Sequence, residues 1–383
     1  MKVAQRGKIQ AFHVMEVLME AQQMAAQGKD VIHLSVGQPW AEVPEPARLH
    51  AAEMLREAAP LGYTDAKGIL PLRQRISQLY RDRHGAEVPV ERIIVTIGSS
   101  AAFFITLLSA FDPGDRIAIA VPYYPAYPNM LEAAGLEAVY IRTDATTNYQ
   151  PTLEMLQALP EKPDGLIIAS PSNPAGTVIC PQELTRIAAY CHENGIRLIS
   201  DEIYHGVTYG DAQVQSAATL SPSAVVVNSF SKYFLMPGWR LGWAVVPEEL
   251  LRSFESLLQN FFISPPAISQ QTAVKVFDCQ DTLNEVVHGY AENRELLLKA
   301  LPELGFRDIS PAHGAFYFYA NVSHLTDDSD AFCRDILHKT GVSLVPGHDF
   351  DRWEGNRYLR LTFAGQHSRV AEAVERLRAY LGK

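Results

Sequence analysis

The sequence lacks the features that mark several large classes of protein. It contains only 4 cysteines in 383 residues (Cys180, Cys191, Cys279 and Cys333), with no CxxC pair, so neither a disulfide framework nor a zinc centre is expected. No apolar run approaches the ~20 residues that a membrane helix needs, and the basic N-terminus leads into no apolar core of the signal-peptide kind. We therefore expect reduced thiols, no membrane partner and a cytoplasmic location.

Positive charge and nucleotide-binding motifs are also missing. The formal net charge is -10 at pH 7, whereas a nucleic-acid partner requires a basic face. No GxGxxG follows any predicted strand, and no Walker-type GK[ST] is present. These absences count against nucleic acid, nicotinamide cofactors and ATP as ligands.

What is present is the composition of an ordinary globular protein, 47% hydrophobic and 20% charged. From residue 92 to 227, apolar runs typical of buried strands alternate with helical patterns, which predicts an α/β fold with a mostly parallel sheet covered by helices. After residue 246 the pattern is helical, and the tail alternates aromatic and apolar residues at 316–319 and 358–362 before a last helix. We expect a large domain over 46–275, and an N-terminal segment (1–45) that joins a smaller α+β domain (276–383).

Helices are also predicted before the first strand of the sheet. Apolar residues recur at roughly helical spacing from Ile9 to Gly28. A second helix is expected from Pro46 to Ala58, and a third begins near Pro71, because proline is favoured in the first turn of a helix.

Lys232 lies just past the apolar run at 224–227. Ligands of open α/β sheets bind beyond the carboxyl ends of the strands, and a desolvated lysine becomes a neutral amine that can form an imine with an aldehyde. Ser229, Ser231 and Arg240 suit a phosphate on the same ligand. An aldehyde and a phosphate in one small molecule indicate pyridoxal phosphate, although a loop lysine taken alone is more often a surface residue.

Other predicted strand ends offer partners for the rest of that cofactor. Asp201 could keep a pyridine nitrogen protonated, Asn173 could donate to a ring hydroxyl, and Tyr124 could stack on the ring. The turn at 98–100, which opens a helix, is a natural anion site. Each feature alone also has an ordinary structural interpretation, as a cap, a rigid turn or a packing residue.

Together, these motifs resemble those of the class I and II aminotransferases, fold-type I enzymes that depend on pyridoxal phosphate. The resemblance is carried by Ser-Asn-Pro-Ala-Gly-Thr at 172–177, Asp-Glu-Ile-Tyr at 201–204, and Ser-Phe-Ser-Lys at 229–232, followed by Arg240. It extends from Gly37 to Arg360. It implies a homodimeric aminotransferase that moves an amino group from an L-amino acid to a 2-oxo acid, with Lys232 joined to the cofactor as an aldimine.

The resemblance also implies a role for each matching residue. Lys232 would shuttle the substrate proton, Asp201 would pair with the pyridine nitrogen, and Asn173 and Tyr204 would hold the phenolic oxygen. Tyr124 would stack on the ring. The phosphate would be held by Ser99, Ser100, Ala101, Ser229 and Arg240, with Tyr63 reaching it from the neighbouring subunit. The substrate carboxylate would be gripped by Arg360, with contacts from Gly37 and Asn173.

The substrate is less sharply indicated. Some bacterial members that use aspartate carry a lysine where this chain has Ala101, and Phe12 and Val14 give the N-terminal segment an apolar character. These features favour a neutral, apolar or aromatic donor, and family habit suggests 2-oxoglutarate as acceptor. A carbon-sulfur β-lyase on the same fold, a non-catalytic sensor module and an enzyme without pyridoxal phosphate remain alternatives.

Overall fold

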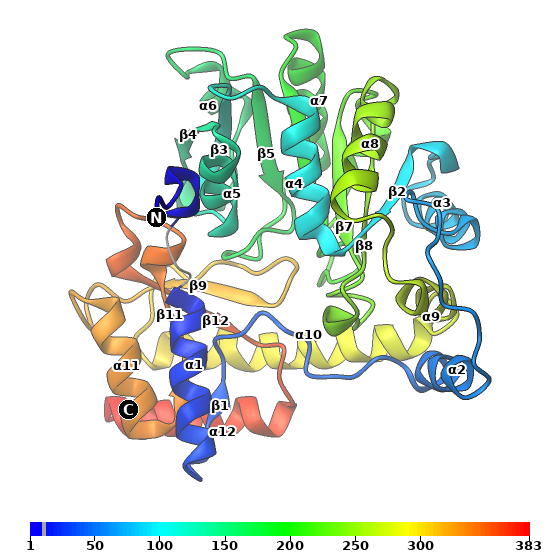
Figure 1. The fold of residues 1–383 in the computed structure, drawn as a ribbon. Helices are drawn as coiled ribbons and strands as arrows, with labels where there is room; N and C mark the ends of the chain where they lie inside the picture. Colours follow the sequence, from blue (N-terminus) through cyan, green and yellow to red (C-terminus); the bar gives the residue numbers. More distant parts are fainter. Residues whose placement is uncertain (10–12) are drawn as a thin grey trace.

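The structure, a computed structural model, describes residues 1–9 and 13–383. Within this part of the chain, a seven-stranded sheet has the order β2-β8-β7-β6-β5-β3-β4 (Figure 1). Its strands are β2 (Ile93–Thr96), β3 (Arg116–Val121), β4 (Glu137–Arg142), β5 (Gly165–Ala169), β6 (Arg197–Asp201), β7 (Val225–Ser229) and β8 (Gly242–Val245). The strands predicted between residues 92 and 227 are therefore confirmed.

The sheet is parallel except for β8, which runs antiparallel to both β7 and β2. Antiparallel neighbours can be joined by a short connection, whereas parallel ones need a long crossover. The twelve residues from 230 to 241 contain no crossover α-helix, only a 3-10 turn at Pro237–Trp239, and the chain turns back beside the end of β7. This turn carries Lys232 and Arg240.

Helices cover both faces of the sheet, because the strands are apolar on both sides. Side chains of alternate strand residues, such as Ile167 and Ile199, pack on one face against α4 (Gly98–Ala110), α5 (Ala126–Ala134) and α8 (Leu251–Phe261). Their neighbours, such as Leu166 and Leu198, join the core of the other face. The helices that contribute to that core are α3 (Leu70–His84), α6 (Leu153–Gln157), α7 (Pro181–Glu193) and α9 (Ala267–Val276). This confirms the predicted α/β architecture.

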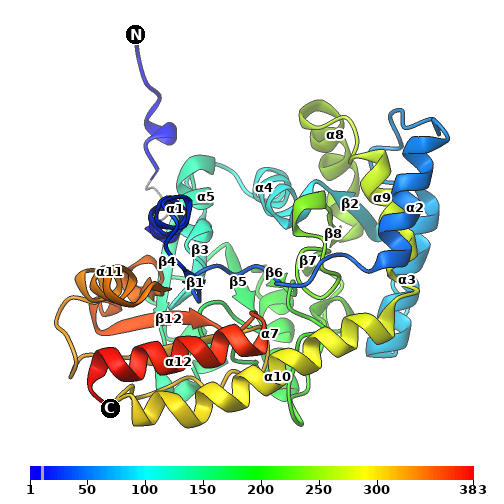
Figure 2. The same cartoon turned by 90° about the horizontal axis from the view of Figure 1, so that it is seen from below.

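A second group of elements lies beyond the carboxyl ends of the large sheet (Figures 1 and 2). It contains an antiparallel sheet of β11 (Val345–Pro346), β12 (Tyr358–Thr362) and β9 (Tyr317–Asn321). A short parallel pair joins β1 (Ile32–His33) to β10 (Val342–Ser343). The helices around them are α10 (Gln280–Glu303), α11 (Ser329–Thr340) and α12 (His367–Leu381). The N-terminal α1 (His13–Ala26) also packs here, against β10 and β11.

Several predicted helices have different limits in the structure. The N-terminal helix begins at His13 in place of residue 9, and residues 10–12 lie outside the described part of the chain. The second helix is α2 (Glu45–Arg56). The helical pattern expected after residue 246 opens with a 3-10 turn at Glu248–Leu250, before α8. After α8 the same helical pattern forms two helices, α9 and α10, separated at 277–279. No helix of the described residues is both long and apolar enough to cross a membrane.

Candidate active site

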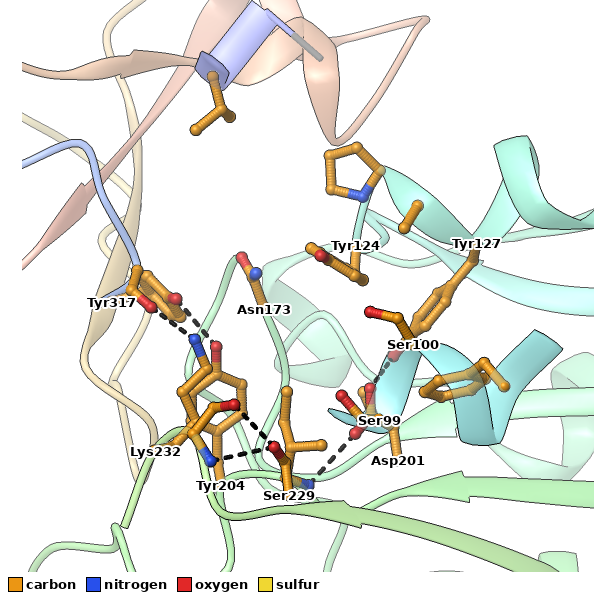
Figure 3. Close-up of a pocket in the computed structure, with 18 of the residues that line it drawn as sticks. Ser99, Ser100, Tyr124, Tyr127, Asn173, Asp201, Tyr204, Ser229, Lys232 and Tyr317 are labelled. Carbon is orange, nitrogen blue, oxygen red and sulfur yellow. Dashed lines mark hydrogen bonds between the residues drawn. The ribbon is translucent and has the colours of Figure 1, made fainter. Parts of the chain in front are cut away.

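The carboxyl ends of β5, β6 and β7 open into a cavity of about 260 Å³ (Figure 3). All of the residues predicted for the site line this cavity except Ala101 and Tyr63. The small sheet and its neighbours close the far side with Tyr317, Phe350 and Arg360, and the N-terminal segment adds Val14 and Gly37. The site therefore lies between the two groups of elements.

Lys232 lies in the turn between β7 and β8, partly buried at the wall of the cavity. Its Nζ donates to the carbonyl of Gly37 and lies 5.7 Å from the ring centroid of Tyr204. Burial, helped by the positive charge of Arg360, lowers the pKa of Lys232 to about 8, although Asp201 opposes the shift. A much larger fraction of this amine is therefore neutral near pH 7 than is usual for a lysine.

Asp201 is the last residue of β6, and only 4% of it is exposed. Its carboxylate accepts hydrogen bonds from the Tyr127 hydroxyl and, over 3.2 Å, from the backbone N–H of Ile203. Burial raises the pKa of Asp201 to about 6, while these two hydrogen bonds act in the opposite direction. The cavity lining thus holds a buried acid that is largely ionised at neutral pH, a charge suited to a cationic ring nitrogen.

An anion-binding cradle forms where α4 begins. Gly98 has φ = +72°, and a β-carbon there would lie 2.7 Å from Nη2 of Arg240, so glycine permits both the turn and the close approach of the guanidinium. The first N–H groups of a helix have no partner within it, and they face the positive end of the helix dipole. Ser99 and Ser100 in this turn, together with Ser229 from β7, complete a cradle suited to a phosphate.

A second cationic group lies on the opposite side of the cavity. Arg360, in the middle of β12, is 3% exposed. It donates to Oδ1 of Asn173 over 3.0 Å and to the carbonyl of Ser35, while its Nε has no partner in the described residues. The rings of Tyr317 and Phe350 lie 4.5 and 4.8 Å from the guanidinium. A buried guanidinium with spare donors and no carboxylate bonded to it is suited to a carboxylate ligand.

Two tyrosines of the site were not singled out from the sequence. The Tyr127 hydroxyl bonds Asp201, and Tyr127 lies three residues after Tyr124, as the second residue of α5. The Tyr317 hydroxyl lies 2.9 Å from that of Tyr204. A β-carbon on residue 37 would lie 1.8 Å from the same Tyr317 oxygen, so Gly37 is required for this contact. Helical spacing from Tyr124 could have indicated Tyr127, but no local signal distinguishes Tyr317 from the other aromatic residues of β9.

Ala101 and Tyr63 lie outside the cavity lining. Ala101 is the fourth residue of α4 and is buried, so any contact that it makes with a phosphate at the start of the helix must come from its backbone N–H. Tyr63 is 84% exposed. It does not line the cavity of its own chain.

Comparison with known proteins identifies the family. Residues 29–377 match the family model for aminotransferase class I and II. The chain belongs to this family. It is 45% identical to the valine–pyruvate aminotransferase of Mycobacterium tuberculosis, over 99% of this chain and 98% of that protein. It is also 35% identical to the (5-formylfuran-3-yl)methyl phosphate transaminase of Methanocaldococcus jannaschii, over 98% of both chains.

Solved aminotransferase structures have the same fold over the whole chain. The crystal structure of an aminotransferase from Mycobacterium tuberculosis superimposes with a TM-score of 0.98 at 44% identity, covering 100% of this chain and 99% of the other. The aspartate aminotransferase of Thermus thermophilus with maleate gives a TM-score of 0.91 at 29% identity over 98% of both chains. Fold-type I architecture, pyridoxal phosphate dependence and transfer of an amino group from an amino acid to a 2-oxo acid follow from this membership.

The cavity of this aminotransferase fits its cofactor. The cradle at α4 suits the phosphate, Asp201 suits the ring nitrogen, and the Lys232 amine lies in the same cavity (Figure 3). When bound, pyridoxal phosphate supplies an aldehyde for the amine and a ring that withdraws electrons from the substrate Cα. The protein must then hold the substrate carboxylate, keep the ring nitrogen cationic and carry a proton to and from Cα.

Proposed function

We propose that Lys232, Asp201 and Tyr204 carry the chemistry of this aminotransferase. Lys232 binds the cofactor aldehyde and then moves the Cα proton, since its lowered pKa allows the amine to act as a base near neutral pH. Asp201 keeps the pyridine nitrogen protonated. Tyr204, fixed by Tyr317, donates with Asn173 to the phenolic oxygen of the ring.

The remaining site residues hold the cofactor ring and its phosphate on one side and the substrate carboxylate on the other. Tyr124 covers the ring face. The residues assigned to the phosphate are Ser99, Ser100, Ala101, Ser229, Arg240 and, from the partner subunit of a dimer, Tyr63. Arg360 binds the substrate α-carboxylate with Asn173 and Gly37, which leaves the substrate side chain facing the N-terminal segment. The spare Nε of Arg360 supports this assignment.

We infer that the amino donor has a neutral side chain. The charged residues that line the described cavity are Lys232, Asp201, Arg240 and Arg360, and each has a role toward the cofactor or the α-carboxylate. The wall that remains is mainly apolar, with Val14, Met15, Val36, Met130 and Phe350. A side-chain carboxylate would therefore be buried without a cationic partner, which is costly.

The relatives support an aliphatic donor. The protein at 45% identity is named for valine and pyruvate, whereas those named aspartate aminotransferases are 28–30% identical to this chain. Val14 lines the cavity, as the sequence suggested, while Phe12 lies outside the described residues. We propose a valine-like donor and a small 2-oxo acid such as pyruvate as acceptor, in place of the 2-oxoglutarate that family habit suggested.

A panel of amino donors tests this proposal. Valine, leucine, phenylalanine, aspartate and glutamate are each paired with pyruvate and with 2-oxoglutarate, and product formation is followed by chromatography. We expect kcat/KM for valine to exceed that for aspartate by at least about 100-fold, because an unpaired buried carboxylate is strongly unfavourable. A preference for aspartate would show that a cation reaches the side chain from elsewhere, and would overturn the neutral-donor proposal.

We also propose a homodimer with shared active sites. The Thr64 N–H donates to Oγ of Ser264 over 3.3 Å, so the loops around residues 63 and 263 lie side by side. These loops carry exposed apolar side chains: Leu61, Tyr63, Phe261 and Ile263. Exposed apolar clusters of this kind mark protein interfaces. Light scattering after size exclusion should give a dimer, and a monomer that is fully active would contradict the shared site.

We also propose a division of the chain into two domains and a cellular location. We assign residues 46–275 to a large pyridoxal phosphate-binding domain, and 1–45 with 276–383 to a second unit, a division supported by the two separate sheets. A cytoplasmic location is supported by the four cysteines, all of which carry free thiols. Limited proteolysis and cell fractionation test these two assignments.

A further inference from the structure

Two buried titratable side chains next to the site take no part in the proposed mechanism. Glu202 and His205 follow β6, in the same turn that presents Asp201 and Tyr204, but they point away from the cavity lining. They are 1% and 4% exposed. Oε2 of Glu202 lies 3.4 Å from Nδ1 of His205, and neither atom has a hydrogen-bond partner in the described structure.

The surroundings fix which nitrogen of His205 carries hydrogen. Its Nε2 lies 3.1 Å from the carbonyl oxygen of Ser170, and a carbonyl can only accept, so Nε2 must be the donor. In the neutral imidazole, Nδ1 then carries no hydrogen, and its lone pair faces Glu202. A carboxylate oxygen and a bare nitrogen at this distance would repel each other, so the pair requires one proton between them.

The neighbouring charges decide where that proton resides. His205 is faced by two groups from α3, the ring of His84 at 5.3 Å and the guanidinium of Arg83, which donates to the His205 carbonyl. Burial, with these two groups, lowers the pKa of His205 to about 3, which disfavours an imidazolium. Burial raises the pKa of Glu202 to about 7, since its other neighbours supply hydrogen bonds but no cation.

Those other neighbours occupy the second oxygen of Glu202. Its Oε1 accepts from Oγ of Ser200 over 3.0 Å and from the N–H of Ala217 over 2.8 Å. Tyr80 of α3 faces it as well, and the proximity of Glu202 is one reason why the pKa of this buried tyrosine is raised. The remaining charge nearby is Asp201, the next residue in the chain, which is itself an acid.

We propose that Glu202 is a positioning residue, held as a neutral carboxylic acid that donates its proton to Nδ1 of His205. The proposal rests on the proposed function, because it concerns the segments that present Asp201, Tyr204 and Asn173. With this proton in place, a chain of hydrogen bonds runs from Ala217 through Glu202 and His205 to Ser170, and it ties the end of β6 to the loop that carries Asn173. A neutral Glu202 also leaves Asp201 as the single negative charge beside the ring nitrogen.

Glutamine at position 202 is the matched variant. In Glu202→Gln, the amide oxygen can accept from Ser200 and Ala217, and the amide N–H₂ can donate to His205, so the pattern of a protonated glutamate is preserved without a titratable group. Glu202→Leu removes every one of these bonds. Glu193→Gln, an exposed residue at the end of α7, is the control for the loss of an acid.

Infrared spectroscopy of the holoenzyme at pH 7 tests the proton directly. A protonated carboxyl group has a carbonyl stretch above the amide bands, and we expect this band to be lost in Glu202→Gln and kept in Glu193→Gln. Absence of such a band from the wild-type minus Glu202→Gln difference spectrum would overturn the proposal. This measurement reports on Glu202 whatever Lys232 binds, so its failure is distinct from failure of the proposed function.

The absorbance of the bound cofactor supplies a readout that a purely structural role would not change. The absorbance of the bound cofactor changes with pH, and the midpoint of this change is the quantity to measure. If Glu202 is neutral, Glu202→Gln should not shift this midpoint. If it is ionised, the substitution removes a negative charge and lowers the midpoint, by about one pH unit for a close charge. Glu202→Leu should raise the cofactor Kd by about ten-fold, because His205 and Ser200 are left unsatisfied. If the leucine variant does not fold, the glutamine measurements alone decide.

Discussion

The guanidinium of Arg360 donates to the side-chain oxygen of Asn173 over 3.0 Å, although 187 positions separate the two residues in the chain. Arg360 belongs to the small sheet, whereas Asn173 lies in the loop after β5 of the large one. Their contact therefore spans the cavity between the two groups of elements. It places the cation that we propose for the substrate carboxylate beside a residue that we propose for the cofactor ring.

Replacement of this arginine should affect the substrate far more than the cofactor. In Arg360→Ala we expect KM for the amino donor to rise by about 100-fold, because charge-assisted hydrogen bonds to the α-carboxylate are lost, while the absorbance of the bound cofactor changes little. Steady-state kinetics and a visible spectrum measure the two effects. Arg357→Ala, an exposed arginine paired with Glu354, is the control. Loss of cofactor from Arg360→Ala with an unchanged KM would contradict the assigned role.

The amine of Lys232 should be required for turnover but not for retention of the cofactor. Lys232→Ala keeps the phosphate cradle and Asp201, so we expect the cofactor to remain bound and transamination to fall by at least about 1,000-fold, as expected for loss of a general base. Single-turnover absorbance with valine measures the loss. In the wild type, borohydride reduction and peptide mapping should tag Lys232 and leave Lys275, an exposed lysine of α9, untouched. A tag on another lysine would remove the foundation of the proposed mechanism.

The sequence was sufficient to predict the strands of the large sheet and the charged residues that line the cavity, for physical reasons. Strands that are buried on both faces must be continuously apolar, so the sequence shows where they begin and end. Ligand-binding residues of parallel sheets lie at the carboxyl ends of the strands. Lys232, Asp201 and Asn173 are each found at or beyond such an end, and these ends are adjacent in the sheet.

The residues that the sequence did not reveal are those brought in by tertiary contacts. Tyr317 meets Tyr204 only because β9 packs across the mouth of the cavity. The division between α9 and α10 was missed because both helices have continuous helical patterns on either side of a short break. The orphaned atoms of Glu202 and His205 are likewise visible only when three segments are packed together.

The lowered pKa of Lys232 predicts how the protein without cofactor takes up pyridoxal phosphate. Only the neutral amine attacks the aldehyde, so the rate of uptake should rise with pH and reach half of its maximum near pH 8, where an ordinary lysine would still be almost fully protonated. In Arg360→Met a positive charge is removed, which favours the protonated amine, raises its pKa and moves this midpoint to higher pH. Stopped-flow absorbance measures the rates. A midpoint that moves to lower pH in this variant would contradict the electrostatic account.

Tyr127 should tune Asp201, because its hydroxyl bonds the ionised carboxylate. A donor of this kind stabilises the charged form, so the bond holds the pKa of Asp201 below the value that burial alone would give. In Tyr127→Phe the pKa of Asp201 should rise. Activity depends on the ionised form of Asp201. As the pH is lowered, the variant should therefore lose activity sooner than the wild type, and the acidic limb of its kcat/KM profile should lie about one pH unit higher. Tyr123→Phe, the neighbouring tyrosine that does not bond Asp201, should leave the limb in place. A displacement toward lower pH in Tyr127→Phe would mean that the hydroxyl accepts from a protonated Asp201, and the acid would then be unable to stabilise a cationic ring nitrogen.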